Sequence, residues 1–260
     1  MGVVYKALDL KLERTVALKF LPTDVAVKDR DKQSLLREAR AASALDHPNI
    51  GVIHGIEESE EHQLFIVMGY YEGETLSQKL WRGVIPVRES LALAIQIARG
   101  LSSAHARHMV HRDVKPSNII ITNEKLVKIV DFGLARVVAT AGATQSISST
   151  GTLPYMAPEQ ILGEAIDQRC DIWALGVILV QMITGSHPFI RPNKGAMTFA
   201  ILNQPPAALD VVPKAVHPIA YRALSKRPEA VMPAPMKCSS IWKPRSPKSR
   251  QVQRRPRNRP

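Results

Sequence analysis

The spacing of apolar residues changes character about a third of the way along the chain. Up to residue 71 the sequence consists of short β-branched runs, such as RTVALKFL and HQLFIVMGYY, around one stretch with helical spacing at residues 31–46. From residue 88 onward helical spacing dominates, beginning with RESLALAIQIARGLSSAHARH. A strand-rich part followed by a helical part argues against a regular alternation of strands and helices. It predicts an α+β chain with two lobes.

The stretch HRDVKPSNIIITNEKLVKIVDFGLA concentrates the polar residues best suited to chemistry. It places Asp113, Lys115, Asn118 and Asp131 within nineteen residues. Two carboxylates and an amide near a short strand pair can hold Mg²⁺ beside a phosphate and take a proton from an attacking hydroxyl. The sequence therefore predicts a site where a metal, a phosphate and a hydroxyl meet.

This stretch resembles the catalytic segment of eukaryotic-type protein kinases, whose catalytic loop is H-R-D-x-x-x-x-N and whose metal loop is D-F-G. Other motifs agree with the resemblance: VALK contains Lys19, LLREAR contains Glu38, and APE ends at Glu159. The segment DIWALG, with Asp171, is similar to the kinase helix that braces the catalytic loop. The resemblance covers residues 2–229, and its overall style is typical of bacterial serine/threonine kinases. It implies a bilobal fold with a small β-rich N-lobe and a larger, mainly helical C-lobe.

The resemblance implies a catalytic role for several residues. Asp113 would orient and deprotonate the substrate hydroxyl, and Lys115 would neutralise charge on the transferred phosphoryl group. Asn118 and Asp131 would hold Mg²⁺. A lysine two residues after the catalytic aspartate, together with GTLPYMAPE, is typical of the class that modifies Ser and Thr hydroxyls of proteins.

The resemblance also implies an ATP site. Lys19 would hold the α- and β-phosphates, with Glu38 as its ion-pair partner on the helix of the N-lobe. Adenine would contact backbone groups of the hinge that follows Met68. The residues expected to contact ATP are Gly2, Val4, Ala17, Lys19, Met68, Gly69, Tyr71, Asn118 and Asp131.

The segment from Asp131 to Glu159 is similar to a kinase activation segment. Arg112, directly before the catalytic aspartate, would receive a phosphate placed on this segment, and self-association would allow autophosphorylation. Thr152 would bond to the catalytic loop, and Arg112, Glu159 and Asp171 would give structural support. The candidate phosphate acceptors are Thr140, Thr144, Ser146, Ser148, Ser149 and Thr150.

The kinase pattern is incomplete at both ends and altered at the hinge. Of the glycine-rich loop G-x-G-x-x-G-x-V, the opening MGVV supplies only Gly2 and Val4. Near residue 230 the pattern stops before the arginine that would pair with Glu159. We therefore expect a kinase domain at 1–229 that lacks its first strand and its last helix, with lobes at about 1–70 and 71–229. Gly69 stands where kinases often have Glu, which predicts a looser hinge.

Residues 230–260 carry most of the net charge of +12. They contain nine Lys and Arg residues, no acidic residue and six prolines, so the remaining 229 residues carry only +3. This composition predicts a disordered basic tail. Nucleic-acid binding through the tail is not favoured, because base-stacking aromatics are almost absent and Trp242 stands alone.

Cysteine and histidine positions give no sign of a metal site. Two cysteines without metal-ligand spacing are typical of a reducing compartment, and we expect a cytoplasmic protein. His105 and His108 lie near the end of a long helix without Cys or acidic residues near them in the sequence. The apolar run DIWALGVILVQMITG is too short to span a bilayer and predicts a buried helix.

Two functions from different classes remain open at this stage, beside a less favoured third in which the basic tail binds nucleic acid or an anionic surface. The first is an active protein kinase that uses ATP and Mg²⁺ on protein substrates. The alternative is a weakly active or inactive kinase-fold fragment that acts as a binding module, which the missing glycine loop favours. Every residue expected to take part in the chemistry is present, so we adopt the first.

Overall fold

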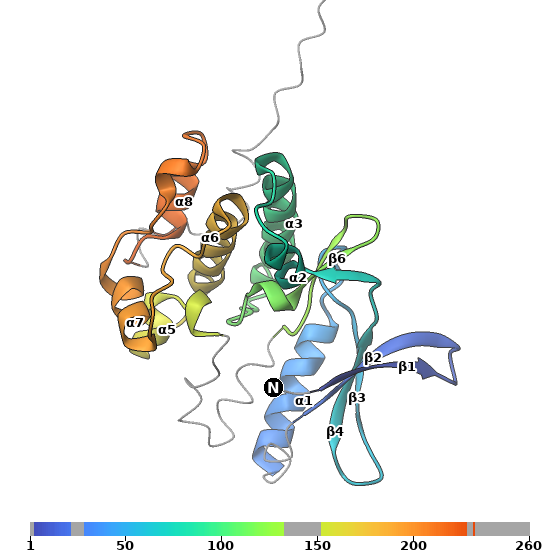
Figure 1. Ribbon diagram of the computed structural model, residues 1–260. Helices are drawn as coiled ribbons and strands as arrows, with labels where there is room; N and C mark the ends of the chain where they lie inside the picture. The colour runs from blue at the N-terminus through green and yellow to red at the C-terminus, as the bar shows by residue number, and fades with distance from the viewer. Residues whose placement is uncertain (1–2, 22–28, 133–151, 228–230, 232–260) are drawn as a thin grey trace, which may run out of the picture.

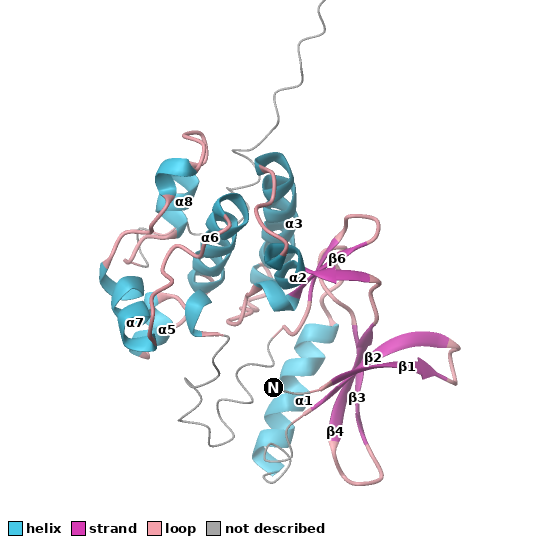
Figure 2. Ribbon diagram, in the orientation of Figure 1, coloured by secondary structure: helices cyan, strands magenta, loops and turns pink. Residues whose placement is uncertain are grey.

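The structure is a computed structural model, and it describes residues 3–21, 29–132 and 152–227 together with Val231. Strands gather in the N-terminal part and helices in the C-terminal part (Figures 1 and 2). The predicted α+β class, with a strand-rich part followed by a helical part, is confirmed. Within the described ranges, no helix combines the length and the apolar character that crossing a bilayer requires.

The N-terminal part is one antiparallel sheet of four strands with the order β1-β2-β4-β3. Its interior consists of side chains from alternating positions of β2 and β4, such as Ala17, Ile66 and Met68, as expected for a sheet buried on one face. The helix α1 packs against β3 (Figure 1). The bounds are β1 (Val4–Asp9), β2 (Arg14–Phe20), α1 (Asp29–Ser43), β3 (Ile53–Glu58) and β4 (Leu64–Gly69).

The C-terminal part surrounds one long buried helix, α6, with a small second sheet of order β5-β6-β7 on the side toward the N-terminal part. The helices are α2 (Leu76–Trp81), α3 (Val87–His105), α5 (Pro158–Leu162), α6 (Arg169–Thr184), α7 (Lys194–Asn203) and α8 (His217–Ala223). The strands are β5 (Gly73–Thr75), β6 (Ile119–Thr122) and β7 (Val127–Ile129). Single 3₁₀ turns are η2 (Pro116–Asn118), η4 (Leu153–Tyr155) and η5 (Leu209–Val211).

Helix α6 is the centre of the helical core. Thirteen of its sixteen residues are buried, because its sequence is apolar on every side, and it ends at Gly185 in the left-handed conformation. The prediction that DIWALGVILVQMITG forms a buried helix is confirmed. Asp171 in its first turn is fully buried as well. A carboxylate in such a place must accept several hydrogen bonds, and those bonds organise the site described below.

The chain near Val231 departs from the expected boundary. Val231 is only 6% exposed and packs against Ile172 of α6 and Ala223 of α8. It falls within the tail predicted to be disordered, so at this residue the chain still contributes to the core. The other tail residues lie outside the described part of the chain, and for them the prediction stays untested.

Helices α6 and α8 approach closely at Gly176. A Cβ atom at this position would lie 2.7 Å from the Cβ of Ala223 and 3.2 Å from a methyl carbon of Leu224.

We expect Gly176→Val to lower the free energy of unfolding by about 1–3 kcal/mol, because helices α6 and α8 must separate to admit the side chain. Denaturant unfolding would measure this loss. Gly195→Ala in α7, where a Cβ meets ordinary contact distances, is the matched control and should cost nothing. Equal stability of Gly176→Val and the parent chain would contradict the close packing.

Candidate active site

Four of the residues expected to contact a nucleotide lie on one face of the N-terminal sheet. The register pairs Val4 with Lys19 across β1 and β2, and Ala17 with Met68 across β2 and β4. Because Ala17 and Lys19 are two residues apart on one strand, their side chains point to the same face. The sheet therefore aligns Val4, Ala17, Lys19 and Met68 on one face, and their contact with a nucleotide stays a prediction.

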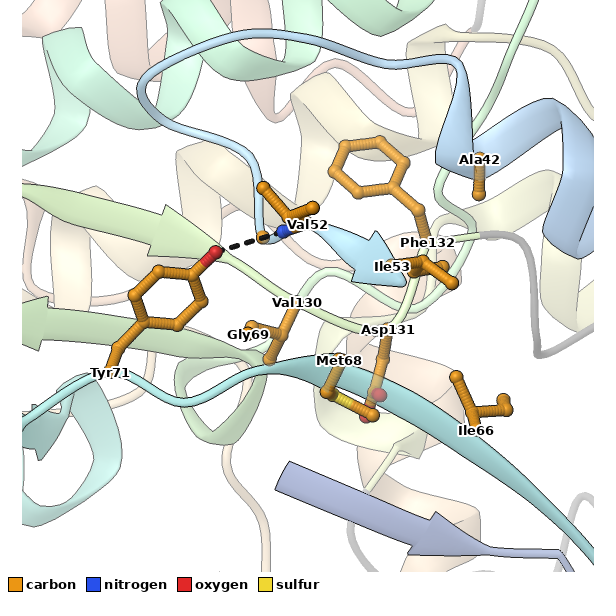
Figure 3. Close-up of a pocket in the computed structure, with 11 residues that line it drawn as sticks. Ala42, Val52, Ile53, Ile66, Met68, Gly69, Tyr71, Val130, Asp131 and Phe132 are labelled. Carbon is orange, nitrogen blue, oxygen red and sulfur yellow. Dashed lines mark hydrogen bonds between the residues drawn. The ribbon is translucent and has the colours of Figure 1, made fainter. Parts of the chain in front are cut away.

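A small pocket, partly open to solvent, lies behind Met68 and Gly69 and reaches toward Asp131 (Figure 3). Its walls come from the end of β4, the segment before β3, and the residues after β7. Tyr71 points back into this region and accepts a hydrogen bond from the backbone N–H of Val52 at 2.9 Å. Hinge residues and the metal-loop aspartate therefore share one cavity.

Lys19 and Asp131 are in direct contact. The Lys19 Nζ lies 2.7 Å from Asp131 Oδ2, and both side chains are about four-fifths buried. The backbone of Asp131 adopts φ = 69°, in the left-handed region that non-glycine residues enter at a cost of about 1 kcal/mol or more. Glu38 lies half-buried on α1. Its pairing with Lys19 stays a prediction.

The catalytic-loop residues meet at Asp113. Lys115 Nζ lies 2.7 Å from Asp113 Oδ2 and donates to Thr152 Oγ1 at 3.0 Å. Asn118 Nδ2 donates to the backbone oxygen of Asp113 at 2.9 Å and to its Oδ2 at 3.2 Å. The 3₁₀ turn η2, with Pro116 at its start, brings these residues together over a short stretch of chain. The predicted contact of Thr152 with the catalytic loop is thus present in the structure.

The donor set fits a divalent cation and a proton acceptor. Asp113 Oδ1 is buried and finds no hydrogen-bond partner in the part of the chain that the structure describes. Asn118 uses its amide nitrogen on Asp113, which leaves its carbonyl oxygen to point elsewhere. Carboxylate and amide oxygens are the ligands that Mg²⁺ takes in proteins. Asp131 and Asn118 can therefore contribute oxygen ligands, while Asp113 Oδ1 is left to accept a proton.

Asp171, in the first turn of α6, binds the backbone of the catalytic loop. Its Oδ2 accepts from the backbone N–H of His111 at 2.9 Å, and its Oδ1 accepts from that of Arg112 at 2.8 Å. His105 Nε2 lies 2.7 Å from Asp171 Oδ2, and both side chains are almost completely buried. The sequence analysis did not identify this acidic partner of His105. The partner lies 66 residues away in the sequence, so local spacing gave no sign of it.

Arg112 and Gln160 join the catalytic loop to the APE motif. The backbone of Arg112 is left-handed, with φ = 66°, and Gln160 Nε2 donates to its carbonyl oxygen at 2.9 Å. Gln160 Oε1 also accepts from the backbone N–H of Ala157 at 2.9 Å. The sequence analysis did not identify Gln160, because a glutamine next to a motif has no pattern that marks it as a bridge.

His111 connects the catalytic loop to the metal loop. Its Nε2 donates to the backbone oxygen of Val130 at 2.9 Å, and its Nδ1 accepts from the N–H of Asp113 at 3.3 Å. Its ring contacts Phe132 edge-on, with 4.5 Å between ring centroids. These contacts use both ring nitrogens, so His111 has a supporting role and is not free to act as a base.

Part of the predicted site lies outside the described residues. This applies to Gly2 of the glycine loop and to all candidate phosphate acceptors of the activation segment. These acceptors are Thr140, Thr144, Ser146, Ser148, Ser149 and Thr150.

Glu159 of the APE motif is a buried carboxylate. It is only 5% exposed, and no ion pair to it is formed by the residues that the structure describes. Burial raises the pKa of Glu159, and its own backbone N–H and the charge of Arg169 offset this only in part. Ionisation of Glu159 is therefore less favourable in the folded chain than in the unfolded chain, and it lowers the free energy of unfolding.

We expect Glu159→Gln to raise the free energy of unfolding at pH 7, because an amide of the same shape removes the charge that burial disfavours. The raised pKa means that the folded chain binds the proton more tightly than the unfolded chain does. The parent chain therefore loses stability as pH rises from the usual Glu range through the raised pKa. The free energies of unfolding of the parent chain and of Glu159→Gln should converge near pH 4. Denaturant unfolding at both pH values tests this, with the exposed Glu164→Gln as control; a pH-independent difference would argue against it.

Comparison with known proteins agrees with this geometry. The sequence matches the protein kinase domain family over residues 1–233. Serine/threonine-protein kinase PknB of Mycolicibacterium smegmatis is 35% identical over 240 residues, which cover 88% of this chain and 38% of that protein. PrkC of Bacillus subtilis is 36% identical over 88% of this chain and 36% of its own length. PknA of Mycobacterium tuberculosis is 38% identical over 80% of this chain and 50% of its own length.

A solved structure shares the fold. The kinase domain of Mycobacterium tuberculosis PknI matches with a TM-score of 0.73 at 28% sequence identity, over 93% of this chain and 90% of that chain. The chain spans between 36% and 50% of the length of the three curated relatives. The family and the bilobal fold predicted from the catalytic motif are confirmed. The chain belongs to the protein kinase family, as a serine/threonine protein kinase domain similar to those of bacteria.

Proposed function

We propose that this chain transfers the γ-phosphate of ATP to Ser or Thr hydroxyls of protein substrates, with Mg²⁺ as the metal. The observation that carries the proposal is the free oxygen of Asp113. Asp113 Oδ1 is buried without a partner, while Lys115 and Asn118 hold the other oxygen of the same carboxylate. A positioned carboxylate with one acceptor left over can orient a hydroxyl and take its proton.

Lys115 supports the transfer step through its charge. Its ammonium lies between Asp113 and Thr152, and its side chain is mostly buried. A cation fixed in a water-poor site stabilises negative charge on a transferred phosphoryl group more strongly than a cation in solvent does. Thr152 fixes that ammonium. Its hydrogen bond therefore ties the C-terminal part of the activation segment to the catalytic loop.

The nucleotide and the metal are assigned to the residues that match the family pattern. Adenine would lie against Val4, Ala17 and Met68 and bond to the backbone at Gly69 and Tyr71. Lys19, supported by Glu38, would hold the α- and β-phosphates. Asn118 and Asp131 would hold Mg²⁺, which neutralises phosphate charge when it is bound. To bind in this way, the phosphates and the metal must replace the direct contact between Lys19 and Asp131.

The proposed substrate class follows from the relatives. PknB, PrkC and PknA are each called serine/threonine-protein kinases, and the chain covers only part of each. We extend to this chain their class of reaction, with protein substrates, and keep the cytoplasmic location as a prediction from the cysteine content alone. A non-catalytic binding module is the competing function, and activity measurements separate the two.

We expect Asp113→Asn and Lys19→Met each to lower phosphorylation of a basic test protein by at least about 100-fold. The first removes the proton acceptor, and the second removes the phosphate anchor. Transfer of labelled phosphate from ATP in the presence of Mg²⁺ is the measurement. Asp210→Asn and Lys214→Met change exposed residues of the same types and should leave the rate unchanged.

Two results would contradict this assignment. Retention of the parent rate by Asp113→Asn or Lys19→Met would show that the residue does not have its proposed role. Absence of phosphate transfer by the parent chain, together with intact folding, would favour the binding module.

Arg112 is placed to respond to phosphorylation of the activation segment. Its Nε is buried and has no hydrogen-bond partner among the described residues. A phosphate on the segment adds about −1.5 to −2 charge and three acceptor oxygens, which would satisfy this donor. Self-association that brings one chain's segment to another chain's Asp113 would supply the modification.

We expect mass spectrometry after incubation with Mg²⁺ and ATP to find phosphate between residues 131 and 159. The Asp113→Asn chain, incubated in the same way, is the control and should remain unmodified. Phosphate found only elsewhere, or at equal levels in the control, would end this proposal.

A further inference from the structure

Gly69 and Tyr71 share one space behind the hinge. A Cβ atom built on Gly69 would lie 2.8 Å from the Tyr71 hydroxyl and 3.0 Å from its Cζ (Figure 3). Real Cβ atoms do not come this close to other heavy atoms, so a side chain at position 69 would displace the tyrosine. The glycine that the sequence analysis associated with a looser hinge therefore makes room for a side chain from two residues further on.

Val52 is bonded to the hinge at two points. Its N–H donates to the Tyr71 hydroxyl at 2.9 Å, and its carbonyl oxygen accepts from the N–H of Gly69 at 2.9 Å. Between strands β3 and β4 the ladder pairs Ile53 with Met68, so these two bonds extend the pairing beyond the strand ends. The hinge is therefore tied to the segment before β3 by one backbone bond and one side-chain bond.

The same segment is bonded to the strand that leads to Asp131. Gly51 N–H donates to the carbonyl oxygen of Ile129 in β7 at 2.7 Å. A Cβ atom on Gly51 would lie 2.9 Å from a Val130 methyl carbon, 3.2 Å from the Ile129 oxygen and 3.6 Å from the Tyr71 ring. Two glycines, at 51 and 69, thus leave the clearance for the ring of Tyr71 and for β7.

A cation lies over the tyrosine ring. Lys128 Nζ of β7 is 4.9 Å from the ring centroid, within the range in which cations are attracted to aromatic faces. Tyr71 therefore contacts β7 through Lys128 and reaches β7 a second time through Val52 and Gly51. Both connections end within three residues of Asp131.

We propose that Tyr71 is a positioning residue that fixes the nucleotide-facing hinge against β7, and that Gly69 leaves free the side-chain space that the tyrosine fills. The proposal rests on the function proposed above, since it assigns the hinge to adenine. It predicts that loss of the tyrosine hydroxyl weakens nucleotide binding more than it slows the phosphoryl-transfer step. It also replaces the expectation of a loose hinge by one of a braced hinge.

The first experiment compares Tyr71→Phe with the parent chain and with Tyr70→Phe. Tyr70 is the neighbouring hinge tyrosine, and its ring lies under Lys6 instead. Tyr71→Phe should speed hydrogen exchange at the Val52 amide and raise KM for ATP about 3- to 10-fold, the effect of one lost hydrogen bond, with kcat within twofold. Tyr70→Phe should change neither. Unchanged exchange at Val52, or an unchanged KM, would overturn the proposal.

The exchange measurement needs no nucleotide, so it also separates this proposal from the proposed function. If the parent chain binds no ATP, the proposed function fails. Faster exchange at Val52 in Tyr71→Phe alone would still support the hinge brace, and equal exchange in both chains would reject it.

The second experiment is a double-mutant cycle on the shared space. Gly69→Ala in the parent chain should raise KM for ATP, because its Cβ displaces Tyr71. In a Tyr71→Ala background the space is empty, and the same substitution should change KM less than twofold. Equal effects of Gly69→Ala in both backgrounds would show that the two positions are independent and would refute the proposal.

Discussion

The buried carboxylate of Asp171 is the constraint on which the catalytic region depends. It sits in the first turn of a helix that is apolar on every side, where an ionised group without partners would be prohibitively costly. The loop backbone at His111 and Arg112 and the ring of His105 supply its partners. Because the carboxylate needs those donors, the loop is held in one arrangement, and the left-handed backbone of Arg112 is maintained by that arrangement.

This dependence explains how the work is divided between the two parts of the chain. The helical core fixes the groups proposed to handle the proton and the metal, since Asp113 and Asn118 follow directly from the loop that Asp171 holds. The sheet supplies Lys19 and an apolar face, and the segment before β3 bonds to β7 of the core through Asn49 and Gly51. Asn49, for example, donates to the carbonyl oxygen of Val127 and accepts from the N–H of Ile129 in β7.

The parts of this site that the sequence could predict are those made by short stretches of chain. Asp113, Lys115 and Asn118 are neighbours in sequence, so a single turn brings them together, and the motif was enough to predict that they form one group. His105 and Asp171 are 66 residues apart, and their contact depends on how α3 packs on α6. The contact between Gly69 and Tyr71 could not be predicted from the sequence either, because tertiary packing decides the direction of a tyrosine side chain. The fold class could be predicted because the spacing of apolar residues is a local property of the sequence. Contacts between helices and strands are not local, so they could not be predicted in the same way.

The direct pair between Lys19 and Asp131 connects the stability of the site to its proposed use. Each charge neutralises the other across 2.7 Å in a mostly buried place, so neither is left uncompensated. The same two charges are complementary to phosphate oxygens and to Mg²⁺. Binding both would therefore exchange one set of opposite charges for another, without leaving a buried charge alone. An isolated phosphate would separate Lys19 from Asp131 and place a second negative charge near the carboxylate. The pair of charges would therefore favour binding of a nucleotide together with its metal ion over binding of the nucleotide alone or of the metal ion alone.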